Sequence, residues 1–494
     1  MLHNEQNVQV CNSHQSSIVV MQMASQKTYT QNFLHADIIS SFKAMSKQTT
    51  ALKKVLKPVH LWALAVGLVI SGEYFGWNYG WGVAGTMGFL IATLVVTVLY
   101  VTFIFSFTEL TTSIPHAGGP FAYAYKAYGP TGGLIAGYAT LIEFVFAPPA
   151  IAFALGSYVH FLYESIPVMY TAVGCYIVFT VINLFGIKES AVFNLIVTIL
   201  AVVELLIFLG IVAPHFETEN FMRNNMPFGV AGIFAALPFA IWFYLGIEGV
   251  AMVAEEVTEP HRNIPKGYIL GIATLVILAL GVMIFSGGIG DWQTLSKIDY
   301  PLPESISMVL GKTNSWTKIF AGIGLFGLIA SFHGLIIGYS RQIFALSRSG
   351  FLPKVLSAVN TKFRTPHWAL ISGGIVGLIS LYSGTTNQVI IISALGAVVM
   401  YCISMMSLLK MKKQLNDAAA FKTPLYPWFP IIALVLSAVC LIAIIWYNFT
   451  LSLIFFAGLA IAFIIFIAMG KHKQPVEDVL LEAVEENHNP KGSY

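Results

Sequence analysis

Apolar runs of roughly 20 residues recur along the whole chain, and each is long enough to cross a bilayer as an α-helix. We count about twelve, at residues 60–80, 83–111, 131–159, 167–186, 189–213, 231–255, 266–289, 317–346, 368–384, 387–411, 428–447 and 449–470. Only 10% of the 494 residues are charged, whereas about a quarter are charged in soluble domains. The runs also lack the ~10-residue alternating segments of membrane β-barrels. The sequence therefore predicts an all-α polytopic membrane protein.

The polar ends of the chain differ from this apolar interior. Residues 1–55 are rich in Gln, Ser and Asn and lack the apolar core of a signal peptide, so we expect a disordered cytoplasmic tail. Residues 56–470 are expected to form the transmembrane domain, and residues 471–494 a second cytoplasmic tail. The sequence leaves open whether translation starts at Met1 or at Met45, which precedes a basic segment.

Lys and Arg residues are concentrated in every second loop. One set of loops carries most of them, including Lys126, Arg262, Arg341, Lys410 and Lys422. Because basic residues are enriched in the cytoplasmic loops of membrane proteins, these loops and both termini are predicted to be cytoplasmic. An even number of spans requires the two termini to share a side.

The segment Ser71–Gly80, inside the first apolar run, combines glycines, aromatic residues and one carboxylate. A carboxylate at hydrocarbon depth is costly, so Glu73 is expected to face the bundle interior or a wet cavity. Gly72 and Gly76 weaken the helix around it, and a broken membrane helix is tolerated only where its freed backbone lines a cavity or is buried in protein. We predict an unwound segment beside a polar ligand. The alternative is a glutamate bonded to a neighbouring helix in a rigid bundle.

The sixth run repeats this pattern. Glu248 lies between Gly246 and Gly249, shortly after the aromatic residues Trp242 to Tyr244. Interrupted segments at matching positions in two halves of a chain indicate the substrate site of an inverted-repeat transporter. Coincidence is the alternative, since glycine is common in membrane helices.

Three further segments resemble motifs of the amino acid–polyamine–organocation permeases: Glu109–Leu110 with Ile114–Tyr123, then Glu255–Pro265, then Ser340–Pro353. In that family they follow the second and sixth helices and end the eighth. The resemblance covers roughly residues 58–470. It implies a five-plus-five inverted repeat with broken first and sixth helices, followed by two further helices. Glu109, Glu255 and Glu256 are expected to make gating contacts with Arg and Lys residues of the loops.

The first break departs from the usual pattern of this family. Amino acid permeases usually carry a Gly-Ser-Gly type break, whose bare amides and helix dipole bind the substrate carboxylate. The corresponding residues here are Ser71, Gly72 and Glu73, and a fixed anion repels a carboxylate and attracts an amine. The segment is similar to that of the bacterial ethanolamine permeases. This resemblance implies import of ethanolamine across the bacterial cytoplasmic membrane by proton symport. A permease or exchanger for amino acids or polyamines is the alternative.

The expected partners are ethanolamine, protons and membrane lipid, without nucleic acid, cofactor or metal ion. The sequence contains no paired nucleophile and base, as an enzyme would need, and no His/Cys metal cluster. A channel or receptor without alternating access is a further possibility, which the paired breaks disfavour.

Eight residues are predicted to bind the substrate: Ser71, Gly72, Glu73, Gly76, Glu143, Trp242, Gly246 and Glu248. Trp242 and Glu248 match an aromatic residue and a glutamate that relatives direct at the substrate, and an indole face attracts cations. Core packing is the alternative for Trp242, and a structural bond to broken backbone is the alternative for Glu248. Glu143, just before a predicted proline kink in the third run, either faces the site or bonds a neighbouring helix.

Four residues are candidates for carrying the coupling proton: Glu73, Glu204, Glu248 and His333. A histidine titrates near neutrality, although a satisfied core histidine is the alternative for His333. Some relatives place a lysine, standing in for a sodium ion, about one turn before Glu204, where this chain has Ala201. Its absence leaves the coupling ion open.

Overall fold

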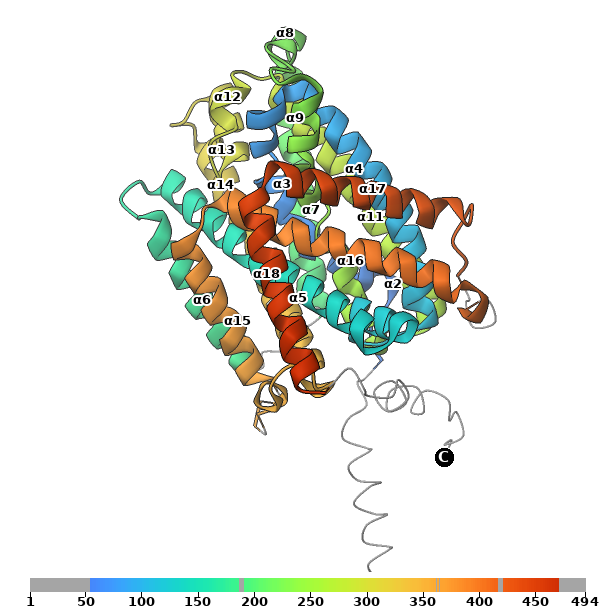
Figure 1. Ribbon diagram of the computed structural model, residues 1–494. Helices are drawn as coiled ribbons and strands as arrows, with labels where there is room; N and C mark the ends of the chain where they lie inside the picture. The colour runs from blue at the N-terminus through green and yellow to red at the C-terminus, as the bar shows by residue number, and fades with distance from the viewer. Residues whose placement is uncertain (1–53, 186–190, 361, 364, 416–420, 471–494) are drawn as a thin grey trace, which may run out of the picture. The chain divides into compact units, whose positions relative to one another are not determined.

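A computed structural model describes residues 54–185, 191–360, 362–363, 365–415 and 421–470 (Figure 1). Throughout these residues the regular structure is helical, apart from one isolated bridge between Leu56 and Val257. The all-α prediction is therefore confirmed. The predicted terminal tails, except for residues 54 and 55, lie outside the described residues.

The bundle is built from long helices and short connecting ones. The long or crossing elements are α2 (Pro58–Val69), α3 (Ser71–Tyr74), α4 (Tyr79–Ser113), α5 (Pro120–Leu162), α6 (Val168–Leu184), α7 (Ala191–Val212), α9 (Gly229–Ala235), α10 (Leu237–Trp242), the 3₁₀ helix η2 (Ile247–Glu256), α11 (Pro260–Gly287), α14 (Ser315–Arg348), α15 (His367–Ser383), α16 (Thr386–Leu415), α17 (Trp428–Tyr447) and α18 (Phe449–Ala468). The connections contain η1 (Ala213–His215), α8 (Thr218–Met222), α12 (Trp292–Leu295), α13 (Pro301–Leu310) and η3 (Lys354–Ser357).

Within the described residues, nine segments are long and apolar enough to cross a membrane. Three shorter apolar helices, α2, α6 and α15, complete the twelve predicted crossings. The first crossing consists of α2, α3 and the start of α4, and the sixth consists of α9, α10 and η2. An even number of crossings brings Pro58 and Ala468 to the same side of the bundle.

The boundary between the first and second crossings differs from the prediction. Gly85 interrupts α4 with φ +70° and ψ 176°, so the first crossing continues beyond residue 80 to this turn. The turn is fixed by the N–H groups of Met87 and Gly88, which donate to Asn225 O at 3.0 and 3.2 Å. Gly129, with φ +68°, separates residues 120–128 of α5 from the third crossing, which agrees with the predicted start at residue 131. Hydropathy does not register such a turn, because the residues on both sides of it are apolar.

Helix α5 is central to the packing of the bundle. It packs along α16 and α14 and also contacts α6 and α15, which lie side by side (Figure 1). Helix α2 packs against α11, α7 and α14. By contrast, only 33% of the apolar window of α17 and 17% of that of α18 is buried, so these two helices lie at the periphery. They are the two helices expected beyond the five-plus-five repeat.

Candidate functional site

The first crossing breaks between α3 and α4. Phe75 is extended (φ −163°, ψ 172°), and Gly76 has φ +90°, a left-handed value that glycine adopts without steric cost. The N–H of Gly76 donates to Asn78 Oδ1 at 2.9 Å, and Asn78 Nδ2 donates to two carbonyls of the α12–α13 segment at 2.6 and 2.8 Å. A break is therefore present inside the predicted segment, but the first four residues of that segment form the helical turn α3.

The sixth crossing breaks after α10. Gly246, with φ +98°, begins η2, and Glu248 is in the first turn of that helix, where the helix dipole favours a negative charge. Tyr401 Oη donates to Glu248 Oε2 at 3.3 Å, and the Tyr401 hydroxyl lies 2.7 Å from that of Tyr100. Glu248 is fully buried, and no group in the described part of the chain bonds its Oε1.

The two breaks pack directly against each other through Trp242. Its Nε1 donates to Phe75 O at 3.0 Å, and the two rings meet edge-on with centroids 5.6 Å apart. A Cβ added at Gly72 would lie 2.4 Å from Trp242 O, and one at Gly76 would lie 2.5 Å from Trp242 Nε1. The glycines of the first break are therefore required for this close approach. Trp242 has a packing role, whatever else its indole face contacts.

Replacing Gly72 should separate the two breaks. The added methyl group of Gly72→Ala meets backbone, which cannot swing away as a flexible side chain can, so we expect a loss of most transport. Gly174→Ala in α6 is the matched control, because a Cβ there has no neighbour within 4 Å. Uptake per molecule of purified protein is the measurement. Equal activity of the two variants would show that the breaks tolerate a wider spacing.

Glu73 lies in α3, directly before the first break, and is completely buried. Neither of its carboxylate oxygens has a hydrogen-bond partner among the described residues. Its backbone carbonyl is used, since it accepts from Trp77 Nε1 at 3.1 Å. A buried carboxylate without partners is strongly destabilising unless a proton or a cation neutralises it. The described structure therefore contains a buried acidic group that either a proton or a cation could neutralise.

Glu143 approaches the second break from α5. It is fully buried, and its carboxyl group faces that of Glu248 and the backbone of Gly246. Its carboxyl group lies within electrostatic range of Glu248. Ser393 Oγ of α16 donates to its backbone carbonyl at 2.7 Å, which holds α5 and α16 together at this level. Two carboxylates in one apolar interior repel each other when both are ionised, so this pair favours a shared proton or cation.

Glu204 contacts the first break through Tyr74. The Tyr74 hydroxyl donates to Glu204 Oε2 at 2.7 Å, and it also lies 3.2 Å from Ala201 O. Tyr158 Oη in turn donates to Tyr74 O at 3.1 Å. Glu204 is thus joined to the residue that follows Glu73, from the side of α7.

His333 lies on a different face of α14 from the one that contacts the first break. Its Nδ1 is 3.1 Å from Asn183 Nδ2 of α6, and its ring packs against Phe179 with centroids 5.7 Å apart. Ser331, two positions earlier, contacts the junction of α2 and α3, one turn before the first break. Ser331 Oγ donates to Gly67 O at 2.7 Å and accepts from Ser71 N at 3.1 Å. The structure therefore does not bring His333 together with the glutamates of the two breaks.

The three sequence motifs meet at one end of the bundle. Glu255 Oε1 of the second motif accepts from Ala117 N of the first at 2.7 Å. Glu256 of the second motif pairs with Arg341 of the third at 3.3 Å. Glu109 pairs with Lys412 at 2.6 Å. The contacts expected of these glutamates with basic residues are therefore present for Glu109 and Glu256, whereas Glu255 bonds backbone.

Comparisons with known proteins agree with this architecture. Residues 56–472 match the family model described as amino acid permease. The chain belongs to the amino acid permease family. An uncharacterized transporter of Rhizobium meliloti is 30% identical over 403 residues, which cover 79% of this chain and 85% of that protein. A methylthioribose transporter and a branched-chain amino acid permease, both of Bacillus subtilis, are each 26% identical. These matches cover 87% and 86% of this chain and 95% and 96% of the two relatives.

This permease is accordingly a multi-pass membrane transporter of the amino acid–polyamine–organocation superfamily and not an enzyme. Three residues of its candidate site were missed in the sequence: Ser331, Tyr244 and Tyr401. Ser331 of α14 bonds the junction of α2 and α3, and Tyr401 of α16 bonds Glu248. Tyr244 lies in the second break, with its hydroxyl 2.7 Å from Thr97 Oγ1. The only sequence signal for them is a hydroxyl in an apolar run, and such side chains are frequent in membrane helices.

Proposed function

We propose that this permease imports ethanolamine across the bacterial cytoplasmic membrane, with Glu73 as the anion that binds the ammonium group. The observation that carries the proposal is the position of Glu73: completely buried, beside both helix breaks, with neither carboxylate oxygen hydrogen-bonded within the described residues. An ammonium ion leaving water needs a strong partner. A charge-assisted hydrogen bond to a carboxylate contributes roughly 1.5–3 kcal/mol.

Ethanolamine fits this site because it carries an amine and a hydroxyl but no carboxylate. A zwitterionic amino acid would place its own carboxylate in the same apolar interior, where repulsion from Glu73 is poorly screened. The named relatives include transporters for a branched-chain amino acid and for methylthioribose, so family membership alone permits substrates with or without a carboxylate. Amino acids and polyamines remain the alternative substrates that competition experiments must test.

Proton coupling is the second part of the proposal. Glu143 and Glu248 lie within electrostatic range of each other, and Glu204 lies beside the first break. These carboxyl groups can take up and release a proton as the site alternately faces the two sides. His333, also predicted for this role, would have to act from its position against α6. We further propose that both termini are cytoplasmic. In proton symport, an inward proton gradient would drive import.

Uptake of labelled ethanolamine into proteoliposomes tests the proposal. We expect an inward proton gradient to stimulate initial uptake several-fold, and a protonophore to remove that stimulation. Preloading with unlabelled ethanolamine should accelerate entry of the label, as a carrier with alternating access requires. Uptake that depends on sodium and ignores the protonophore would contradict proton symport. Uptake without saturation or counterflow would instead indicate a channel.

A further inference from the structure

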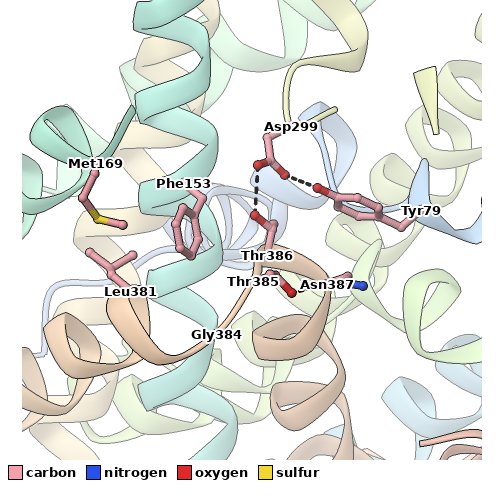
Figure 2. A pocket seen from close by; sticks show the side chains of 9 residues that line it. All are labelled: Tyr79, Phe153, Met169, Asp299, Leu381, Gly384, Thr385, Thr386 and Asn387. Carbon is pink, nitrogen blue, oxygen red and sulfur yellow. Dashed lines mark hydrogen bonds between the residues drawn. The ribbon is translucent and has the colours of Figure 1, made fainter. Parts of the chain in front are cut away.

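A cleft of about 480 Å³ opens at the end of the bundle where α4 and α16 begin, next to the residue that follows the first break. Residues from five parts of the chain line it (Figure 2). Among them are Tyr79, Phe153, Asp299, Leu381, Thr386 and Asn387. None of the residues predicted from the sequence to bind substrate lines this cleft. Its volume is within the usual range for small-molecule sites.

Asp299 is the charged residue of this lining. Its two carboxylate oxygens accept from the hydroxyls of Tyr79 and Thr386, the latter at 2.9 Å, as the dashed lines in Figure 2 mark. Both donors are neutral, so the negative charge is not compensated. Within the described residues, no Lys, Arg or His forms an ion pair with Asp299 or lines the cleft. Burial raises the pKa of Asp299, the expected effect of removing a carboxylate from water without supplying a cation.

The other lining groups suit a small organic cation. Tyr79 and Phe153 contribute aromatic rings, which attract an ammonium group through their π faces. The Thr385 hydroxyl donates to Asn387 Oδ1, which leaves the Asn387 Nδ2 group as a donor for a polar substituent. We propose that this cleft is a second binding site, for a small organic ammonium ion, with Asp299 as its counter-ion. The identity of the cation as ethanolammonium rests on the proposed function.

The position of the cleft connects it with the first break. Tyr79 is the first residue of α4, directly after the break. The neighbouring Asn78 bonds the carbonyls of Leu295 and Ile298, in the segment that leads to Asp299. With both termini cytoplasmic, this end of the bundle is external. The cleft is then an outer site from which the cation passes to Glu73.

Calorimetric titration of the purified full-length protein with ethanolammonium chloride, against sodium chloride at equal ionic strength, tests this site. The titration is done in a Glu73→Gln background, so that binding at the first break is weakened. We expect a weak binding event to remain, and Asp299→Asn to weaken it at least about tenfold. Phe153→Leu should weaken it a few-fold through loss of the ring. Asp291→Asn, the same change at an exposed helix cap in the same segment, should have no effect.

Gel filtration and thermal melting identify a variant that fails to fold, and Phe153→Leu then tests the cleft without altering its charge. The inference is overturned if Glu73→Gln alone removes all binding, or if neither Asp299→Asn nor Phe153→Leu weakens what remains. Failure of the proposed function would give a different experimental result. In that case Glu73→Gln would transport ethanolamine like the wild type, while the isotherms would still report on Asp299.

Discussion

Glu73→Gln is expected to fold normally and to bind ethanolamine at least about tenfold more weakly than the wild type. Glutamine keeps the shape of the side chain but removes the charge that binds the ammonium group. The buried carboxylate has no hydrogen-bond partner to lose among the described residues, so the fold should not suffer. Equilibrium binding of labelled ethanolamine to purified protein measures the effect, and thermal melting checks the fold.

Two further variants complete this experiment. Glu248→Gln tests the rival carboxylate at the second break. Glu219→Gln, the same change at an exposed position in α8, is the control that should bind normally. If Glu73→Gln binds normally and Glu248→Gln does not, the cation site belongs to η2. If both bind normally, the argument for a cation site fails and Glu73 is structural.

Glu109→Gln should produce the largest loss of stability. Glu109 is fully buried and accepts from Lys412 Nζ at 2.6 and 2.8 Å, and from Thr423 N and Oγ1 at 2.9 and 2.6 Å. Removing its charge leaves the Lys412 ammonium, with a side chain only 12% exposed, without its carboxylate. Breaking a buried ion pair in this way costs about 3–5 kcal/mol. Denaturant titration in detergent micelles measures the change.

The matched control for this loss is an exposed ion pair. Glu164 and Lys312 lie 2.8 Å apart with side chains 73% and 58% exposed, and solvent screens such a pair. Glu164→Gln should therefore leave the unfolding midpoint nearly unchanged. Similar losses of stability in Glu109→Gln and Glu164→Gln would mean that the ion pair between Glu109 and Lys412 contributes no more than a surface ion pair.

The sequence predicts the crossings and the existence of both breaks, because each depends on local composition. Twelve apolar runs follow from hydropathy, and Glu73 and Glu248 stand out because a carboxylate between glycines is rare in an apolar run. The residues at which a helix actually breaks depend on distant contacts. The first break lies at residues 75–78 partly because Asn78 bonds carbonyls more than 200 positions away, which no local pattern contains.

Side chains that reach the site from other helices are harder to predict. Ser331 bonds the start of α3, whereas His333 contacts α6, although they are two residues apart on α14. Helical periodicity separates them onto different faces, but the sequence does not say which face meets α3. His333 is predicted to carry the coupling proton because a histidine can titrate. The contact with α3 is instead made by the hydroxyl of Ser331.

The central claim is that the site selects an amine without a carboxylate, and competition at equilibrium tests it most directly. Labelled ethanolamine bound to the purified wild type would be displaced by unlabelled ethanolamine, ethylamine, putrescine or alanine. We predict that ethanolamine competes best, that ethylamine retains much of this affinity, and that alanine fails to compete at concentrations at least about tenfold higher. Displacement by alanine at the same concentration as ethanolamine would contradict the role assigned to Glu73.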